Sequence, residues 1–412
     1  DDMHPHIYKT TDAGKTWKEI VNGLATDPIN SVKEDTQRKG MLFAGSEKAV
    51  FVSFDDGEHW QSLKLDMPAT SVRDLVIKDD DLVIGTHGRG FWILDDITPL
   101  RQLSAKNVNA KAFLFQPQTA IRVRWSMYPD TPLPQEEPAG ENPPDGAIID
   151  YYLQSDAKDA VLEISNEKGN LIRRYTNKDT LYIIPDVNIP LYWIRPQQIL
   201  SATKGSHRFL WDMHYAPLNT APEYPISAIY KNTVPTPSSP WVMPGRYVAK
   251  LTVDGAIFTQ TFNVAMDPRV KTSINDLQMQ HDISLQCYQN QKEIAAISNE
   301  VNQWINSVNA LAAKAKGKSA SGLRTFSDQL QRMLDASNAS QPGFDKLSNA
   351  FASVFGILQE ADMTPTTQTV QAFKAAQASY ESTKQSWIEF KTATLPKLNK
   401  QLKSAGLPLL SE

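Results

Sequence analysis

The pattern of hydrophobic and polar positions changes once along this chain, near residue 265. Before that point, short apolar runs alternate with polar residues at a period of two, as in AIIDYYLQS (147–155) and AVLEISN (160–166). After it, apolar residues recur at spacings of three and four, as in Ile294, Ile297 and Val301. The first pattern is typical of half-buried strands and the second of amphipathic helices. The sequence therefore predicts a β-rich part followed by a helical part.

An internal repeat is visible in the first hundred residues. SVKED (31–35) returns as SVRDL (71–75), and LFAG (42–45) returns as LVIG (82–85), each 40 positions later. A third round begins with FWILDD (91–96), where Asp95 is aligned with Asp55 of the second round. A period of about 40 residues made of short strands is typical of four-stranded propeller blades. We therefore predict consecutive blades of a β-propeller.

Two octets, TTDAGKTW (10–17) and SFDDGEHW (53–60), share the pattern [S/T]-x-D-x-G-x-x-W. Glycine permits a positive φ, the aspartate carboxylate accepts hydrogen bonds from turn N–H groups, and the tryptophan can pack across a hairpin. We predict a structural role for the residues that carry the pattern, which are Thr10, Asp12, Gly14, Trp17, Ser53, Asp55, Gly57 and Trp60.

The octets resemble the Asp-box, or BNR repeat, of sialidases, some xyloglucanases and sortilin-type propellers. GTHGRGFWILDD (85–96) resembles the last-blade sequence of large bacterial Asp-box proteins often labelled "glycosyl hydrolase" or sortilin-like. The resemblance implies boxes that are structural and lie away from the ligand centre, in a propeller followed by a β-sandwich and a helical tail. Two blades and a fragment cannot close a ring, which needs at least four. We therefore expect further blades on an upstream segment or a separate chain.

The chain is divided accordingly into several domains, β-rich and then α-helical. We predict the last propeller blades with a connecting segment that packs on them (1–127), a proline-rich linker (128–146), an immunoglobulin- or fibronectin-like β-sandwich (147–265) with a proline-rich insertion (216–245), and an antiparallel helical bundle (266–412). Ser273 is predicted to cap the first long helix, and Thr364, followed by Pro365, the last one.

Composition excludes several classes of function. With 42 basic and 46 acidic residues the net charge is −4, so no basic excess favours nucleic acid. No run approaches the roughly 20 apolar residues that a membrane crossing requires. Cys287 is the only cysteine, which rules out an intramolecular disulfide and a multi-thiolate metal site.

We predict no metal site and no cofactor. His4 and His6 form an H-x-H pair without a visible third ligand, and a strand-edge role fits them better. His207 and His214 are seven residues apart, which places them on opposite faces of a strand.

Catalytic residues cannot be assigned from this sequence. The pairs Asp55/Asp56 and Asp95/Asp96 and the run Asp79–Asp81 are adjacent residues in turns, whereas a glycosidase needs two carboxylates about 5 to 9 Å apart across a cleft. His87 and Arg89 lie between Gly85, Gly88 and Gly90 and are the candidates for ligand contact, although a glycine-permitted turn explains them as well.

Together with the resemblance, these features predict a non-catalytic bacterial protein of the cell surface or exterior. Its propeller would bind a peptide, protein or glycan, and the chain would act as a scaffold or as a subunit of a cell-surface complex. The cysteine-rich module of animal sortilins is absent, which argues against a sorting receptor. The alternative is a sialidase- or xyloglucanase-like glycoside hydrolase whose catalytic carboxylates lie in upstream blades.

Overall fold

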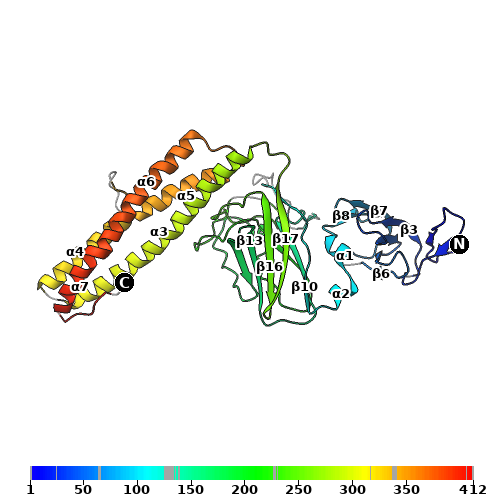
Figure 1. The fold of residues 1–412 in the computed structure, drawn as a ribbon, viewed down its shortest axis with the longest axis horizontal. Coiled ribbons are helices and arrows are strands. Elements are labelled where there is room, and N and C mark those ends of the chain that lie inside the picture. Colours follow the sequence, from blue (N-terminus) through cyan, green and yellow to red (C-terminus); the bar gives the residue numbers. More distant parts are fainter. Residues whose placement is uncertain are drawn as a thin grey trace.

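The computed structural model describes residues 2–24, 26–63, 66–124, 134, 136–137, 140–225, 229, 231–315, 317–335, 341–404 and 406–410. Figure 1 shows an elongated molecule with small sheets at the N-terminal end, larger sheets in the middle and helices at the other end. The fold is therefore mixed β and α, with several sheets followed by a C-terminal helical region. At this level the sequence prediction is confirmed.

Among the described residues before position 98, short antiparallel strands form three sheets. These are β1 (Tyr8–Lys9) with β2 (Lys18–Glu19); β3 (Ile29–Glu34), β4 (Leu42–Ser46), β5 (Val50–Ser53) and β6 (Gln61–Ser62); and β7 (Val72–Lys78), β8 (Asp81–Thr86) and β9 (Phe91–Leu94). The β3–β6 sheet and the β7–β9 sheet each run in sequence order, as consecutive hairpins do. LFAG and LVIG occupy the second strand of their sheets.

The strand ladders correct two of the equivalences in the repeat. Ser31 pairs with Gly45 and Asp74 with Gly85, so Ser31 corresponds to Asp74, 43 residues later, and not to Ser71. The reason is that the chain between equivalent ladder positions, Glu34 to Leu42 and Ile77 to Leu82, is three residues shorter in the later sheet. Likewise Ser53 and Leu94 occupy the same ladder position, so Asp96, and not Asp95, stands where Asp55 does.

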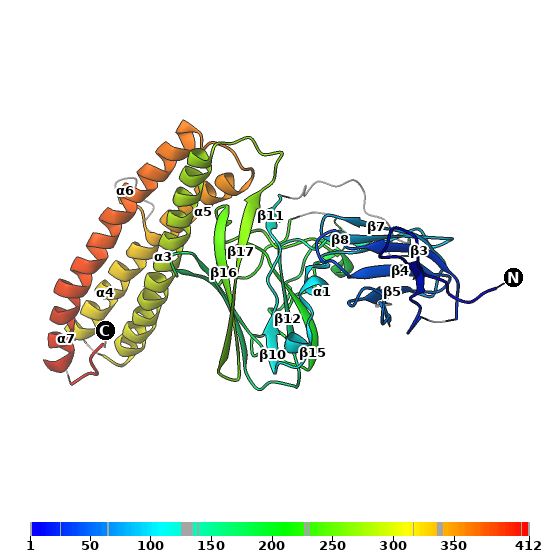
Figure 2. The ribbon, with the colours of Figure 1, turned by 45° about the vertical axis from the view of Figure 1, so that its right-hand side comes forward.

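The β3–β6 and β7–β9 sheets pack face to face through an apolar core (Figure 2). The buried side chains of this core include Phe43, Val50, Val52, Val72, Leu75, Leu82 and Ile84. The other face of the β3–β6 sheet is covered by the N-terminal segment, where Ala44 and Phe51 pack with Ile7, Ile20 and Trp60. Each fully buried aliphatic or aromatic side chain of this kind contributes about 1.5 to 3 kcal/mol.

The connecting segment after β9 contacts both the N-terminal sheets and the middle sheets. Its helix α1 (Thr98–Gln102) packs on the N-terminal sheets, because Arg101 forms a buried ion pair with Asp35 at 2.9 Å. The short helix α2 (Ala105–Val108) follows. The expectation that the whole segment packs on the propeller is wrong for the next strands.

Those next strands, β10 (Ala112–Leu114) and β11 (Ala120–Arg122), join the middle sheets. β10 pairs antiparallel with β12, and β11 pairs parallel with β17. One middle sheet has the order β10-β12-β15 and the other β11-β17-β16-β13-β14. The remaining strands are β12 (Ala147–Leu153), β13 (Ala160–Asn166), β14 (Leu171–Thr176), β15 (Gly205–Trp211), β16 (Gly245–Val253) and β17 (Ala256–Met266), with a short 3-10 helix, η1 (Leu191–Trp193).

The two middle sheets enclose one core. Trp211 of β15 is fully buried and contacts Tyr247 of β16 and Phe262 of β17, so both sheets contribute to the same aromatic cluster. Part of the linker predicted over 128–146 lies outside the described residues, as does part of the insertion over 216–245. The described part of the insertion meets the sheet region through the bridge between His214 and Trp241.

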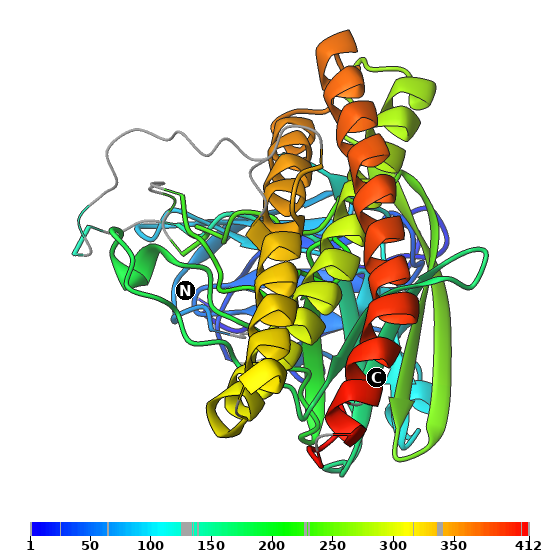
Figure 3. The same cartoon turned by 90° about the vertical axis from the view of Figure 1, so that its left-hand side faces the viewer.

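The helices of the C-terminal region lie alongside one another (Figure 3). They are α3 (Ile274–Lys314), α4 (Gly317–Asp335), α5 (Phe344–Gln359), α6 (Thr367–Glu389), the π-helical segment η2 (Phe390–Thr394) and α7 (Leu395–Ser404). Ser273 caps α3 as predicted, since its hydroxyl accepts a hydrogen bond from the Asp276 N–H at 3.2 Å. Among the described residues, none of the helices combines the length and the apolar character that a membrane crossing requires.

The predicted cap of the last helix is wrong by two residues. α6 is capped by Thr366, whose hydroxyl accepts from the Thr369 N–H at 3.2 Å, and not by Thr364. Thr364 and Thr366 are both suitable N-cap residues, so the sequence alone does not distinguish between them. Which of the two caps the helix depends on how α6 packs.

A buried polar junction joins the helices to the middle sheets. Arg122 on β11 and Asp362, between α5 and α6, form an ion pair at 2.5 Å in which each side chain is only 3% exposed. Arg124 pairs with the same carboxylate at 3.0 Å, and both guanidinium groups lie over the ring of Trp241. His214 contacts that ring, with 4.0 Å between ring centroids.

Candidate functional site

The two octets form turns with the same hydrogen bonds. In the first, the Thr10 hydroxyl donates to Asp12 at 2.9 Å and accepts from the Gly14 N–H at 2.9 Å. In the second, the Ser53 hydroxyl donates to Asp55 at 2.9 Å and accepts from the Gly57 N–H at 3.0 Å. Gly14 and Gly57 have φ values of 88° and 87°, which side chains disfavour. The pattern positions therefore build the turn itself.

The carboxylates of both turns are engaged locally. Asp12 accepts from the Thr16 N–H and hydroxyl, and these bonds lower its pKa. Burial opposes ionisation of Asp55, but hydrogen bonds from His59 and Ser53 outweigh it, so its pKa is also lowered. A carboxylate held ionised by its own turn is a poor general acid at neutral pH.

The tryptophans of the two octets differ in their surroundings. Trp60 is buried and donates its indole N–H to the Ile20 carbonyl at 2.8 Å. Gly57 of the same octet approaches Ile20 closely, so that a Cβ at Gly57 would clash with that side chain. Trp17 at the matching position is 61% exposed. The second octet thus connects two successive repeat units, and the first leaves its tryptophan at the surface.

His87 and Arg89 lie in the β8–β9 turn, and both are exposed. The turn is held by Thr86, whose hydroxyl donates to the Gly90 carbonyl at 2.6 Å, and by the positive φ of Gly88 and Gly90. In the ladders this turn corresponds to the β4–β5 turn and lies at the opposite end of the sheet from the octet position. The predicted ligand contacts and the octets are therefore separate features.

A polar group that sequence reasoning missed surrounds Glu47 at this end of the sheets. Asn30 donates its side-chain N–H to Glu47 at 2.9 Å, and Arg73 forms an ion pair with it at 3.2 Å. The hydrogen bond from Asn30, with the nearby charges of Arg73 and His87, lowers the pKa of Glu47. Asn30 lies on β3, Glu47 in the β4–β5 turn and Arg73 on β7. The signal in the sequence was the polar character of each of these positions.

A small hollow of about 190 Å³ gathers acidic residues that the sequence left apart. Its lining includes Asp79, Asp80, Asp81, Asp95, Gln118, Pro143, Pro144 and Ile148. Asp80 is neutralised by Arg101, and Asp81 accepts a hydrogen bond from the Asp96 N–H at 2.9 Å. Burial and the neighbouring Asp81 raise the pKa of Asp95.

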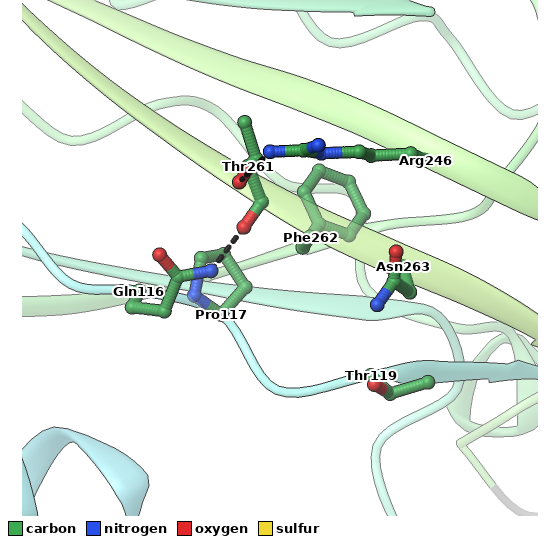
Figure 4. A pocket seen from close by; sticks show the side chains of 7 residues that line it. All are labelled: Gln116, Pro117, Thr119, Arg246, Thr261, Phe262 and Asn263. Carbon is green, nitrogen blue, oxygen red and sulfur yellow. Dashed lines mark hydrogen bonds between the residues drawn. The ribbon is translucent and has the colours of Figure 1, made fainter. Parts of the chain in front are cut away.

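A larger hollow of about 350 Å³ lies beside β17, far along the chain from the repeat (Figure 4). Its lining residues are Gln116, Pro117, Thr119, Arg246, Thr261, Phe262 and Asn263. Gln116 donates to the Thr261 carbonyl, and Arg246 contacts the Thr261 hydroxyl at 3.4 Å. The exposed lining is polar, because Phe262 is turned into the core and only 3% exposed.

The histidine pairs are each engaged separately. His6 is held between Glu19 and Asp2 at 3.0 Å each, and these hydrogen bonds raise its pKa. His207 donates to the Thr203 carbonyl at 2.6 Å, whereas His214 lies on Trp241. Within the described part of the chain, no group of three or more His, Cys, Asp or Glu residues has the geometry to hold a metal ion.

Comparisons with known proteins give little similarity. No protein-family model matches the chain, and no curated protein matches it. Two solved structures are similar over part of the chain: the extracellular domains of a putative one-component system and of a putative hybrid two-component system, both from B. thetaiotaomicron. They share 9% and 10% sequence identity over 65% and 64% of this chain, each with a TM-score of 0.20. This chain covers 29% of the length of each. At these values the likeness identifies neither a family nor a function.

Proposed function

We propose that this chain is part of a non-catalytic bacterial protein, exposed outside the cytoplasm, that binds a peptide, protein or glycan and serves as a scaffold. In this proposal the N-terminal sheets are blades of an Asp-box propeller, and the middle sheets are an immunoglobulin- or fibronectin-like sandwich. The extracytoplasmic location and the bacterial origin rest on the Asp-box resemblance alone.

The observation that carries the proposal is the engagement of the octet side chains within their own turns. Asp12 and Asp55 accept hydrogen bonds from groups four residues later, and Thr10 and Ser53 are bound to those same carboxylates. Such residues stabilise hairpins, and their polar groups are already engaged within the turn. Repetition of one such turn on successive sheets supports a scaffold role.

The group around Glu47 supports binding at one end of the sheets. His87 and Arg89 are exposed on the β8–β9 turn, and His87 lies close enough to the Arg73–Glu47 pair to lower the pKa of Glu47. Mixed charges on turns that a rigid sheet positions are suited to polar ligands, including peptides and glycans.

The test has two arms. The chain is incubated with aryl-sialoside, aryl-glucoside and xyloglucan substrates, and we expect no turnover. Turnover that is lost in Asp95→Asn would place an acid catalyst in the acidic hollow and overturn the proposal.

In the second arm, binding to glycan and peptide arrays is compared between the native chain and the double variant His87→Ala/Arg89→Ala. We expect weaker binding at an unchanged melting temperature, and unchanged binding would refute the assigned contact site.

A further inference from the structure

The β7–β9 sheet has one covered face and one uncovered face. Leu75, Leu82 and Ile84 point into the core shared with the β3–β6 sheet. On the opposite face, Val76, Val83 and Ile93 form a cross-strand row, because Val76 pairs with Val83 and Val83 pairs with Ile93. Phe91, two ladder positions further along β9, lies on the same face.

The apolar side chains on the uncovered face are strongly exposed to solvent. Val76 is 49% exposed, Ile93 56% and Phe91 82%, while Val83 is half-buried. Three large apolar side chains next to one another on an exposed sheet face are characteristic of an interaction surface. Among the described residues, no strand pairs with the outer edge of β9 either, although β6 occupies that position beside β5.

The chain itself shows what covers such a face. The ladders make Phe43 of the β3–β6 sheet equivalent to Val83 of the β7–β9 sheet, because Phe43 pairs with Val52 where Val83 pairs with Ile93. In the same way, Val52 is equivalent to Ile93 and Val50 to Phe91. Phe43 and Val50 are fully buried and Val52 is 4% exposed. They are buried because the next sheet, β7–β9, lies on them with Leu75, Leu82 and Ile84.

From this correspondence we infer that Val76, Val83, Phe91 and Ile93 form a docking surface for a further antiparallel sheet of the same repeat, supplied by a polypeptide segment outside residues 1–412. That sheet presents aliphatic side chains at the positions of Leu75, Leu82 and Ile84, and a strand added beside β9 completes a four-stranded sheet. The inference deepens the proposed scaffold role, on which it rests, by naming a partner surface.

A second copy of this chain is a poorer occupant. The complementary aliphatic face of its β7–β9 sheet is already buried against β3–β6, and that of its β3–β6 sheet is covered by the N-terminal segment. Another apolar surface near the repeat is the N-terminal hairpin with Tyr8 and Trp17, whose strands β1 and β2 are each two residues long. A hairpin of that size cannot cover the row from Val76 to Ile93.

The experiment adds one repeat to the chain. Residues 1–93 are joined to residues 53–412, which restores a complete octet after the first copy of β9 and places a second copy of β7–β9 next in line. Oxidative footprinting with mass spectrometry then measures Phe91 in each copy, because the junction gives the first copy a distinct peptide. We expect first-copy labelling to fall to the level of buried Phe43, while the second copy stays as reactive as Phe91 in the 412-residue chain.

A matched pair of variants tests the contact directly. Phe91→Lys in the first copy should restore labelling of the first-copy Ile93, and Phe91→Lys in the second copy should change nothing. Equal labelling of both copies in the unsubstituted tandem chain would overturn the inference. So would concentration-dependent dimerisation of the 412-residue chain that Phe91→Lys abolishes, because the occupant would then be a second copy. Neither readout depends on glycoside turnover or ligand binding, so failure here is distinguishable from failure of the proposed function.

Discussion

Trp60 donates its indole N–H to the main-chain carbonyl of Ile20, a residue of the preceding repeat unit, at 2.8 Å. The bond is buried, and the Trp60 main-chain N–H also donates to the Asn22 carbonyl at 2.8 Å. One residue of the octet therefore holds two successive units together. Trp17, at the same position of the first octet, has an exposed ring.

This difference predicts unequal effects of one substitution at the two positions. Trp60→Phe leaves the buried Ile20 carbonyl without its donor, so we expect a loss of about 1 to 3 kcal/mol in the free energy of unfolding. Trp17→Phe removes an exposed group and should change stability by less than about 0.5 kcal/mol. Urea unfolding of the two variants measures both values. Equal losses would show that Trp17 is also in a buried contact.

The octet carboxylate gives a second prediction, on local stability. Asp55→Ala removes the acceptor of the Ser53 hydroxyl and of the His59 N–H. Because Asp55 is partly exposed, water replaces some of these bonds, and we expect a loss of about 1 to 2 kcal/mol. Hydrogen exchange at the His59 amide should accelerate, while amides of the middle sheets stay unchanged. Ligand binding that vanishes without any change in exchange would contradict the structural role.

Sequence patterning located the turns and helices but not the partners of the strands. Ser273 was identifiable as a cap because its bond to the Asp276 N–H is local. The equivalence of Ser31 with Asp74 was missed because the connections between the first and second strands differ in length. A comparison without gaps aligns the second strands, β4 and β8, correctly and therefore misaligns the first strands, β3 and β7. The misplacements in the repeat concern pairing between strands, whereas the misplaced cap of α6 concerns the choice between two nearby threonines.

The same limit applies to the middle sheets and to the candidate site. β11 pairs with β17 across more than 140 residues, and nothing in AIR (120–122) specifies that partner. The group around Glu47 forms only in the folded chain, because Asn30 and Arg73 lie on different strands and both contact Glu47. Patterning indicates that a position is buried or polar, whereas the fold decides which residues meet there.

The junction between sheets and helices yields a third prediction. Asp362→Ala leaves Arg122 buried without its carboxylate, and removal of one partner of a buried pair costs about 3 to 5 kcal/mol. Burial already lowers the pKa of Arg122 against the opposing effect of Asp362. The control is Lys178→Ala, since Lys178 and Asp159 are 65% and 48% exposed in their ion pair, and its loss should leave the melting temperature unchanged. A similar melting temperature for Asp362→Ala and the native chain would show that this ion pair contributes little.

Acidification should weaken the same junction. Burial lowers the pKa of His214 in spite of the nearby Asp212, and burial likewise lowers the pKa of His281. Arg124 also lies close enough to His214 to disfavour its protonation. Because both folded pKa values lie below the value of about 6.5 in the unfolded chain, the unfolded state binds more protons as the pH falls through 6.5.

The stability associated with these groups is therefore fully present above about pH 6.5 and decreases below it, by up to about 1.4 kcal/mol per pH unit for each histidine. Urea unfolding between pH 7.5 and pH 5 measures the slope in the native chain and in His214→Leu. We expect a shallower slope in the variant, with a residual contribution from His281. If His214→Leu keeps the native slope, His214 binds protons equally in the folded and unfolded chain, and the acid sensitivity originates from other titratable groups.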